Sequence, residues 1–121
     1  RQHPVQIIRQ GERAKMAEGE VEYEELLKPD ANDKSNNFEA YVIRIPAHSN
    51  THRGSSGHIG REMGIIVKGK GELHYENEVY HMEEGDSVSF PASGPHTLQN
   101  TGDSDLEAIW IVTPAQRFVR E

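Results

Sequence analysis

The chain has 121 residues, which allows one domain with a single core and leaves no room for a second. Its formal charge of −7 and the scatter of its Lys and Arg residues exclude this segment as a binder of phosphate backbones, so any DNA contact would need another domain. The absence of cysteine excludes disulfides and thiolate chemistry, and the longest clean apolar stretch, residues 108–112, is too short to cross a bilayer. We therefore expect a cytoplasmic protein without a membrane partner.

Short β-like runs separated by turn residues recur along the whole chain. They cover residues 5–8, 21–27, 38–45, 62–68, 72–76, 78–82, 87–90, 96–100 and 106–113. Regular short strands without a long helical period predict an all-β sandwich or barrel. For residues 12–18, a short helix is an alternative, because several good helix formers occur there.

Two N-terminal segments have a distinct character. Val21, Tyr23 and Glu25 alternate with three further glutamates, which predicts an edge strand with a charged outer face. Residues 29–37 contain Asp, Asn, Lys and Ser without an apolar period. This composition predicts a surface loop, with a functional lid as the alternative.

His58, Glu62 and His96 stand at fixed intervals from landmark residues, in His58-x3-Glu62-x6-Gly69 and His96-x3-Asn100. If residues 57–68 are extended, His58 and Glu62 point to the same face of one strand. His96 from a later strand would complete a two-histidine, one-carboxylate metal site. Such a set suits divalent iron, zinc, nickel or manganese, so the identity of the metal stays open. The alternative is a metal-free barrel whose same residues hydrogen-bond a small anion or polar ligand.

Other residues on predicted strands are candidates for the wall of a ligand site. An inward Arg44 would clamp a carboxylate or phosphate, although an outward orientation fits the pattern equally well. Buried Tyr and Trp residues carry a polar group that lines ligand sites or simply accompanies packing. The candidates are Tyr41, Arg44, Tyr75, Gln99, Asn100 and Trp110. The sequence contains no nucleophile motif, phosphate loop or dinucleotide fingerprint, so no catalytic residue is predicted.

The two histidine motifs resemble the two signature motifs of the cupin superfamily and cover about residues 54–100. The first family motif reads G-x5-H-x-H, three or four residues, E, six residues and G. His58 and Glu62-x6-Gly69 fit it, whereas Ser56 stands where the first histidine is expected. His52 would replace that ligand only if the turn-forming loop 53–57 folds back.

The second family motif reads P-x-G-x2-H-x3-N. His96 and Asn100 fit it, and Pro91 and Gly94 stand slightly out of the strict spacing. The resemblance implies a single-domain cupin double-stranded β-helix, a jelly-roll barrel, over residues 1–121. It also implies a divalent metal ion in the barrel.

Within the cupins, the chain is similar to the C-terminal sensor domain of bacterial regulators that join a lambda-repressor-like helix-turn-helix to a cupin. The segments that carry this likeness are residues 58–64, 69–72, 84–91, 95–96, 100–103 and 110–114. The likeness implies a homodimeric sensor that binds a small-molecule effector and signals to a DNA-binding domain upstream of residue 1. The start at Arg1 rather than at a methionine agrees with that expectation.

The alternative function is a mononuclear metal-dependent cupin enzyme that acts on a small-molecule substrate. A His-x3-Glu plus a later His also resembles the ligand set of cupin-type non-haem iron oxygenases and epoxidases. A small isomerase on the same barrel is a third possibility. For the tail after Pro114, we expect Phe118 and Val119 to dock onto a neighbouring subunit or to cover the end of the barrel.

Overall fold

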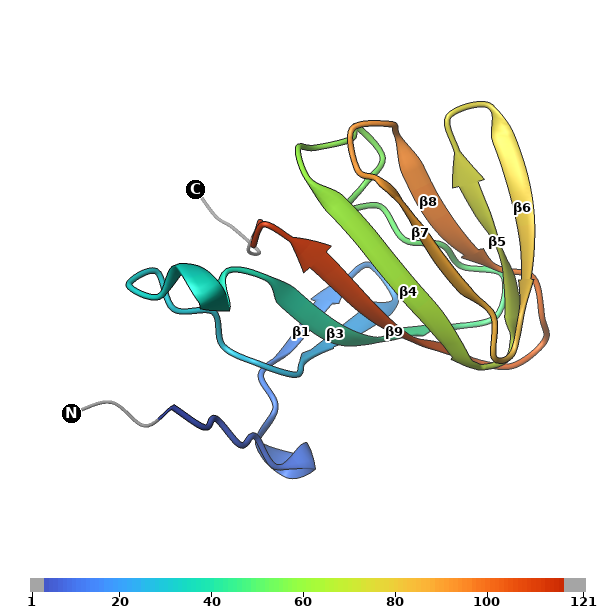
Figure 1. Ribbon diagram of the computed structural model, residues 1–121. Coiled ribbons are helices and arrows are strands. Elements are labelled where there is room, and N and C mark those ends of the chain that lie inside the picture. The colour runs from blue at the N-terminus through green and yellow to red at the C-terminus, as the bar shows by residue number, and fades with distance from the viewer. Residues whose placement is uncertain (1–3, 117–121) are drawn as a thin grey trace.

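The computed structural model describes residues 4–116, whose regular structure is almost entirely β-strand (Figure 1). The strands are β1 (Lys15–Glu18), β2 (Val21–Glu25), β3 (Glu39–Ile45), β4 (Arg61–Lys68), β5 (Lys70–Tyr75), β6 (Glu78–Glu83), β7 (Ser87–Pro91), β8 (His96–Asn100) and β9 (Leu106–Thr113). Two short 3-10 helices, η1 (Gln10–Glu12) and η2 (Lys34–Asn36), lie in connections. The predicted all-β jelly-roll fold is confirmed.

The strands form two antiparallel sheets. The larger sheet has the order β1-β2-β3-β9-β4-β7, and the smaller one has the order β6-β5-β8. In the larger sheet, β9 lies between β3 and β4, so the end of the chain closes the barrel beside two much earlier strands (Figure 1). The hydrophobic core draws its side chains from both sheets.

The inner face of the large sheet follows the period of two that a β-strand imposes. Along β4, the residues from Glu62 to Ile66 alternate between buried and exposed. The register aligns Glu39 of β3 with Val112 of β9, and Val112 with Glu62 of β4. Two buried carboxylates therefore lie in one row across the sheet, with Val112 between them.

Two expectations for the N-terminal part are wrong, and so is one alternative. Residues 5–8 form no strand; the Gln6 side chain holds this segment to the backbone of Lys28, donating to its carbonyl and accepting from its N–H. β1 occupies part of the segment for which a helix was the alternative. β2 is not an edge strand, because β1 and β3 pair with it on both sides. The inward residues Val21 and Tyr23 are buried, so the acidic alternation marks one face of an interior strand.

Residues 29–37 connect β2 to β3 and contain η2, in agreement with the predicted loop. Residues 118 and 119 of the predicted docking tail lie outside the described part of the chain. Within residues 4–116, no helix combines the length and apolarity that a bilayer-spanning segment needs.

Candidate metal centre and ligand cavity

Each of the three predicted metal ligands comes from a different element. Glu62 is the second residue of β4, and its inward side chain is buried. His96 is the first residue of β8 in the opposite sheet and is also buried. His58 lies in the loop before β4 and is half-buried. The facing sheets and one loop thus bring together residues that are distant in the sequence.

The expectation that His58 and Glu62 project from one strand is wrong. β4 begins only after His58, which Gly57 and Gly60 flank with φ angles of 74° and 105°. Residues with a Cβ rarely adopt such angles. A Cβ at either glycine would also collide with a backbone oxygen. The backbone N–H of His58 donates to the Ala92 carbonyl at 2.9 Å. A loop with a glycine on either side of His58 therefore places this residue at the site.

The potential metal-binding atoms converge on one carboxylate oxygen. His58 Nε2 lies 2.6 Å from Glu62 Oε2, and His96 Nε2 lies 2.9 Å from the same oxygen. One ligand atom from each of the three residues lies within 4.8 Å of the other two. Ligands that bind one ion at about 2.0–2.2 Å and at right angles lie about 3 Å apart. Small side-chain adjustments would therefore suffice to hold a metal ion.

The outer nitrogens of the two imidazoles show that the site suits a cation. His58 Nδ1 lies 2.9 Å from the Ile59 carbonyl oxygen, and His96 Nδ1 lies 2.7 Å from that of Gly94. A neutral imidazole has one N–H, and a carbonyl oxygen beside Nδ1 requires the N–H to be there. Nε2 then carries a lone pair, which faces Glu62. Opposed lone pairs repel unless a proton or a metal ion lies between them. Metal-bound histidines are held in the same way by oxygen acceptors at their outer nitrogen.

The pKa values of Glu62 and His96 are shifted from their usual values in opposite directions. Burial would raise the pKa of Glu62, but contacts with His96, Trp110 and His58 outweigh it and hold this pKa below its usual value. Burial would lower the pKa of His96, but the Glu62 carboxylate and the Gly94 carbonyl raise it. Both shifts favour a Glu62 carboxylate beside a positively charged group. The Trp110 indole N–H donates to Glu62 Oε1 at 2.7 Å, which fixes the carboxylate and leaves Oε2 to the histidines.

No side chain fills the fourth ligand position of the resembling motif. Ser56 and His52 are both exposed, and within residues 4–116 no further His, Asp or Glu joins the cluster. Gly54 covers the His96 ring instead, and its carbonyl accepts from the His96 backbone N–H at 2.9 Å. A Cβ at position 54 would overlap the imidazole. An ion held by three protein ligands would keep positions for further ligands.

A cavity of about 450 Å³ adjoins the trio between the two sheets. This volume is in the range of sites for small organic molecules. Its apolar walls are formed by Ile43, Leu73, Leu98 and Val112. Trp110 and Tyr41, two of the six predicted wall residues, line the cavity.

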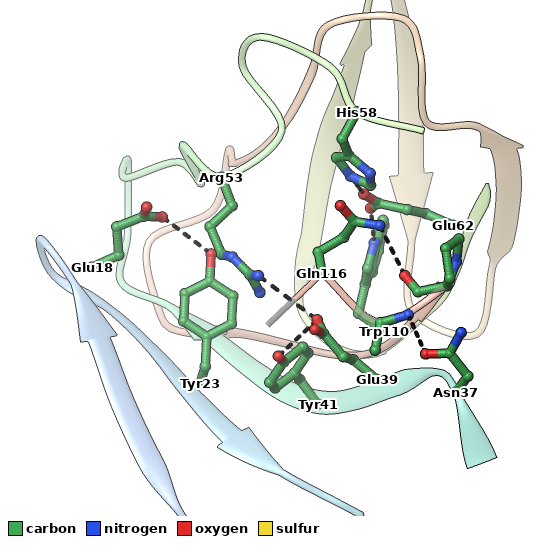
Figure 2. Close-up of polar contacts among 12 residues, drawn as sticks. Glu18, Tyr23, Asn37, Glu39, Tyr41, Arg53, His58, Glu62, Trp110 and Gln116 are labelled. Atoms are coloured by element: carbon green, nitrogen blue, oxygen red, sulfur yellow. Dashed lines mark hydrogen bonds and ion pairs between the residues drawn. The ribbon is translucent and has the colours of Figure 1, made fainter. Parts of the chain in front are cut away.

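The cavity is also lined by a second polar group, Glu18, Tyr23, Tyr41 and Arg53. Together with Glu39, which contacts Tyr41 and Arg53, these residues are here called the arginine cluster (Figure 2). The Tyr41 hydroxyl donates to Glu39 Oε1 at 2.8 Å, and Arg53 Nη2 lies 3.7 Å from that oxygen. The Tyr23 hydroxyl donates to Glu18 Oε1 at 3.4 Å. Burial, followed by the nearby glutamates, raises the pKa of both tyrosines, so both remain hydrogen-bond donors.

The other four predicted wall residues lie away from the cavity. Arg44 points outward and forms ion pairs with Glu22, Glu24 and Glu107. The Tyr75 hydroxyl donates to the Pro91 carbonyl, although the ring stacks near His96. Asn100 is buried, and its amide donates to the carbonyls of Ile45 and Ser104, which ties the end of β3 to the loop between β8 and β9. Gln99 alternates with the buried residues of β8 and faces the other way.

Sequence reasoning missed Glu39 and Arg53. Glu39 follows the same two-residue period as the buried Tyr41, Ile43 and Ile45 of β3, and this period was the available signal. Arg53 stands in a turn-rich segment before the first motif, where no pattern indicates an inward side chain.

Comparison with known proteins gives one curated relative, an uncharacterized protein of Methanocaldococcus jannaschii that is 28% identical over 53 residues. The match covers 44% of this chain and 42% of that relative, so it spans less than half of the relative's length.

Solved structures resemble the fold over most of this chain. A predicted oxalate decarboxylase from Thermotoga maritima is 25% identical, with a TM-score of 0.73 over 88% of this chain and 97% of that one. Hydroxypropylphosphonic acid epoxidase from S. wedmorenis, in complex with fosfomycin, is 16% identical, with a TM-score of 0.73 over 89% of this chain and 59% of the epoxidase. The cupin domain of an XRE family transcriptional regulator from Enterobacter cloacae is 16% identical, with a TM-score of 0.65 over 83% and 98%.

The family model described as "Cupin domain" matches residues 41–112, which make up more than half of the chain. The match includes all three residues of the trio and most of the residues that line the cavity. The jelly-roll sheets and the solved neighbours agree with it. The chain therefore belongs to the cupin family.

Proposed function

We propose that this cupin binds a divalent metal ion through His58, Glu62 and His96 and presents it to a small molecule in the adjoining cavity. One observation carries the proposal: both histidines commit Nδ1 to a backbone carbonyl and aim Nε2 at the same oxygen of Glu62. A bound ion would supply Lewis acidity to an oxygen atom of the small molecule. Trp110 orients the carboxylate, and the apolar walls limit access of water to the site.

The test is elemental analysis of the purified protein after loading in turn with iron(II), nickel, manganese and zinc and removal of excess metal. We expect one of these metals to remain in stoichiometric amount in the wild type and to be lost in His58→Ala and His96→Ala. His81→Ala is the matched control, because that histidine is exposed and lies outside the trio. Equal metal content in His96→Ala and the wild type would disprove the assignment.

For the use of the bound molecule, we propose sensing in a transcriptional regulator, as a homodimer with a DNA-binding domain upstream of residue 1. Support comes from the motif resemblance and from the likeness in fold to the cupin domain of the Enterobacter cloacae regulator. The test is to extend the coding sequence upstream and search the translated segment for a helix-turn-helix. A start codon immediately before Arg1 would contradict the proposal.

The second candidate is a mononuclear metalloenzyme, and the specific observation in its favour is the three-ligand site beside a cavity. Open coordination positions suit a substrate as well as an effector. Turnover distinguishes the two, because a sensor returns its ligand unchanged whereas an enzyme converts it. Mass spectrometry of a ligand after prolonged incubation with metal-loaded protein and air gives the answer.

A further inference from the structure

The arginine cluster holds the Arg53 head group in a fixed place. Its guanidinium carbon lies 5.8 Å from the ring centroid of Tyr23 and 5.5 Å from that of Tyr41. Both distances fall within the cation–π range of about 6 Å. The two rings are themselves packed edge to face, with centroids 5.7 Å apart. Two mutually packed rings therefore position the guanidinium before any ligand arrives.

Glu39 makes this positive charge tolerable inside the barrel. Its side chain is only 3% exposed, and its Oε1 lies 3.7 Å from Arg53 Nη2 while it also accepts the Tyr41 O–H. Arg53 itself lines the cavity, and 22% of its side chain is exposed, so an oxyanion in the cavity can approach the guanidinium beside its ion pair with Glu39. Figure 2 shows the Arg53 side chain reaching toward Glu39, with Tyr23 beside it.

The sheet register sets the spacing between Glu39, the ion-pair partner of Arg53, and Glu62 of the metal trio. Glu39, Val112 and Glu62 lie side by side on β3, β9 and β4. Neighbouring strands are about 4.8 Å apart, so the backbones at Glu39 and Glu62 are separated by about 10 Å. Arg53 and Glu62 both line the cavity, and a short bifunctional molecule can span a separation of this order. The surface between them is apolar at Val112.

Glu18 is the group that opposes an anion at this end. Its carboxylate accepts the Tyr23 O–H and is half-buried, so solvent and salt screen part of its charge. Glu39 already has Arg53 and the Tyr41 hydroxyl as partners. On the opposite side, a dication bound by one carboxylate and two neutral imidazoles leaves a net positive charge, which attracts an oxygen ligand.

We propose that the cavity takes short-chain organic acids whose carboxylate or phosphonate pairs with Arg53 while an oxygen at the other end of the molecule faces the metal trio. The inference rests on the proposed function, because it needs the metal-centred cavity. It assigns to Arg53 the recognition of the acid.

Fluorescence of Trp110 provides the assay, because the chain contains one tryptophan and this residue lines the cavity. Metal-loaded full chain is titrated with succinate, glutarate and 3-phosphonopropionate, and with neutral succinamide for comparison. We expect at least one acid to bind about tenfold more tightly than succinamide, because charge-assisted hydrogen bonds are stronger than neutral ones. Comparison of glutarate with the phosphonate shows which oxyanion is preferred.

Arg53→Met should weaken binding of that acid by about 10- to 100-fold, which corresponds to the loss of a charged hydrogen-bond pair. Arg53→Lys should recover part of the affinity because it keeps the charge without the fork. Arg44→Met is the matched control, since Arg44 lies on the outer face of the barrel. If Arg53→Met does not fold because Glu39 is left unpaired, the double variant Glu39→Gln/Arg53→Met removes both charges and is measured instead.

Acid binding that Arg53→Met leaves at the wild-type strength would overturn the inference. So would metal-loaded protein that binds none of the three acids, and this result would leave the metal site intact. Elemental analysis of the same samples separates the two proposals. Protein that takes up no metal overturns the proposed function, and the inference with it.

Discussion

The two polar ends of the cavity differ in how their charges are matched. At the metal trio, two imidazole nitrogens and a carboxylate oxygen converge within 4.8 Å of one another. With both imidazoles neutral, all three atoms are electron-pair donors. In the arginine cluster, the guanidinium and the Tyr41 hydroxyl face the acceptor Glu39. Converging lone pairs need a cation, whereas the Glu39 acceptor already has its donors when the chain folds. The first end should therefore respond to metal, and the second should govern stability and the choice of ligand.

The contrast between the two ends of the cavity is tested most directly at the carboxylates of Glu62 and Glu39, which lie in one row of the sheet. Glu62→Gln removes the negative ligand and places an amide opposite two imidazoles, so we expect loss of stoichiometric metal. Glu39→Gln makes the same chemical change at a residue buried to a similar degree, and we expect the metal to be retained. Metal content is measured per mole of folded protein. Equal losses in the two variants would show that the ends of the cavity are not distinct.

A second change tests the trio without altering a ligand. Gly54→Ala places a methyl group where the His96 imidazole lies, and the backbone at position 54 is not in the left-handed region, so the collision is the main effect. Displacement of one histidine should weaken metal binding by about 100-fold, the upper end of the range for residues that support metal ligands. Competition with a chelator measures the affinity.

Gly11→Ala is the control for this change, since a Cβ there meets no atom within 4 Å. Unaltered metal affinity in Gly54→Ala would mean that His96 does not need its position against the loop.

A smaller effect is expected from the orientation of the carboxylate. Trp110→Phe removes the N–H that donates to Glu62 Oε1, and metal affinity should fall by about tenfold. Tyr75→Phe is the control, because the Tyr75 ring also lies near His96 while its hydroxyl donates to the Pro91 carbonyl. If the two variants bind metal equally well, the indole has a packing role only.

The contrast also explains which parts could be predicted from the sequence. The bounds of β8 and β9 agree with the predicted runs, because each alternates clearly between buried and open faces. The three residues of the trio were selected by motif spacing, and the structure places them together. The route of His58 could not be predicted, because it depends on two left-handed glycines that only the packed backbone requires.

The arginine cluster could not be predicted because its members meet only through lateral register. Tyr41 and Tyr23 belong to neighbouring strands, and Arg53 reaches them from a loop that pairs with β8. Nothing in the spacing of these residues indicates that they meet. Arg44 lies in an apolar run of the sequence, which made it a candidate for the cavity wall. In β3, however, the odd-numbered residues point inward, so Arg44 lies on the outer face.

The smallest effect is expected from a change in the arginine cluster. Tyr41→Phe removes one hydrogen bond to the buried Glu39 carboxylate, so the free energy of unfolding should fall by about 2 kcal/mol, as for other hydrogen bonds to charged groups. Denaturant unfolding of metal-free protein measures the change, with Tyr80→Phe as the control because Tyr80 is exposed on β6. The metal content of Tyr41→Phe should match that of the wild type. A variant that kept its stability but lost its metal would reverse the roles assigned to the two ends, since the hydroxyl would then act on the trio.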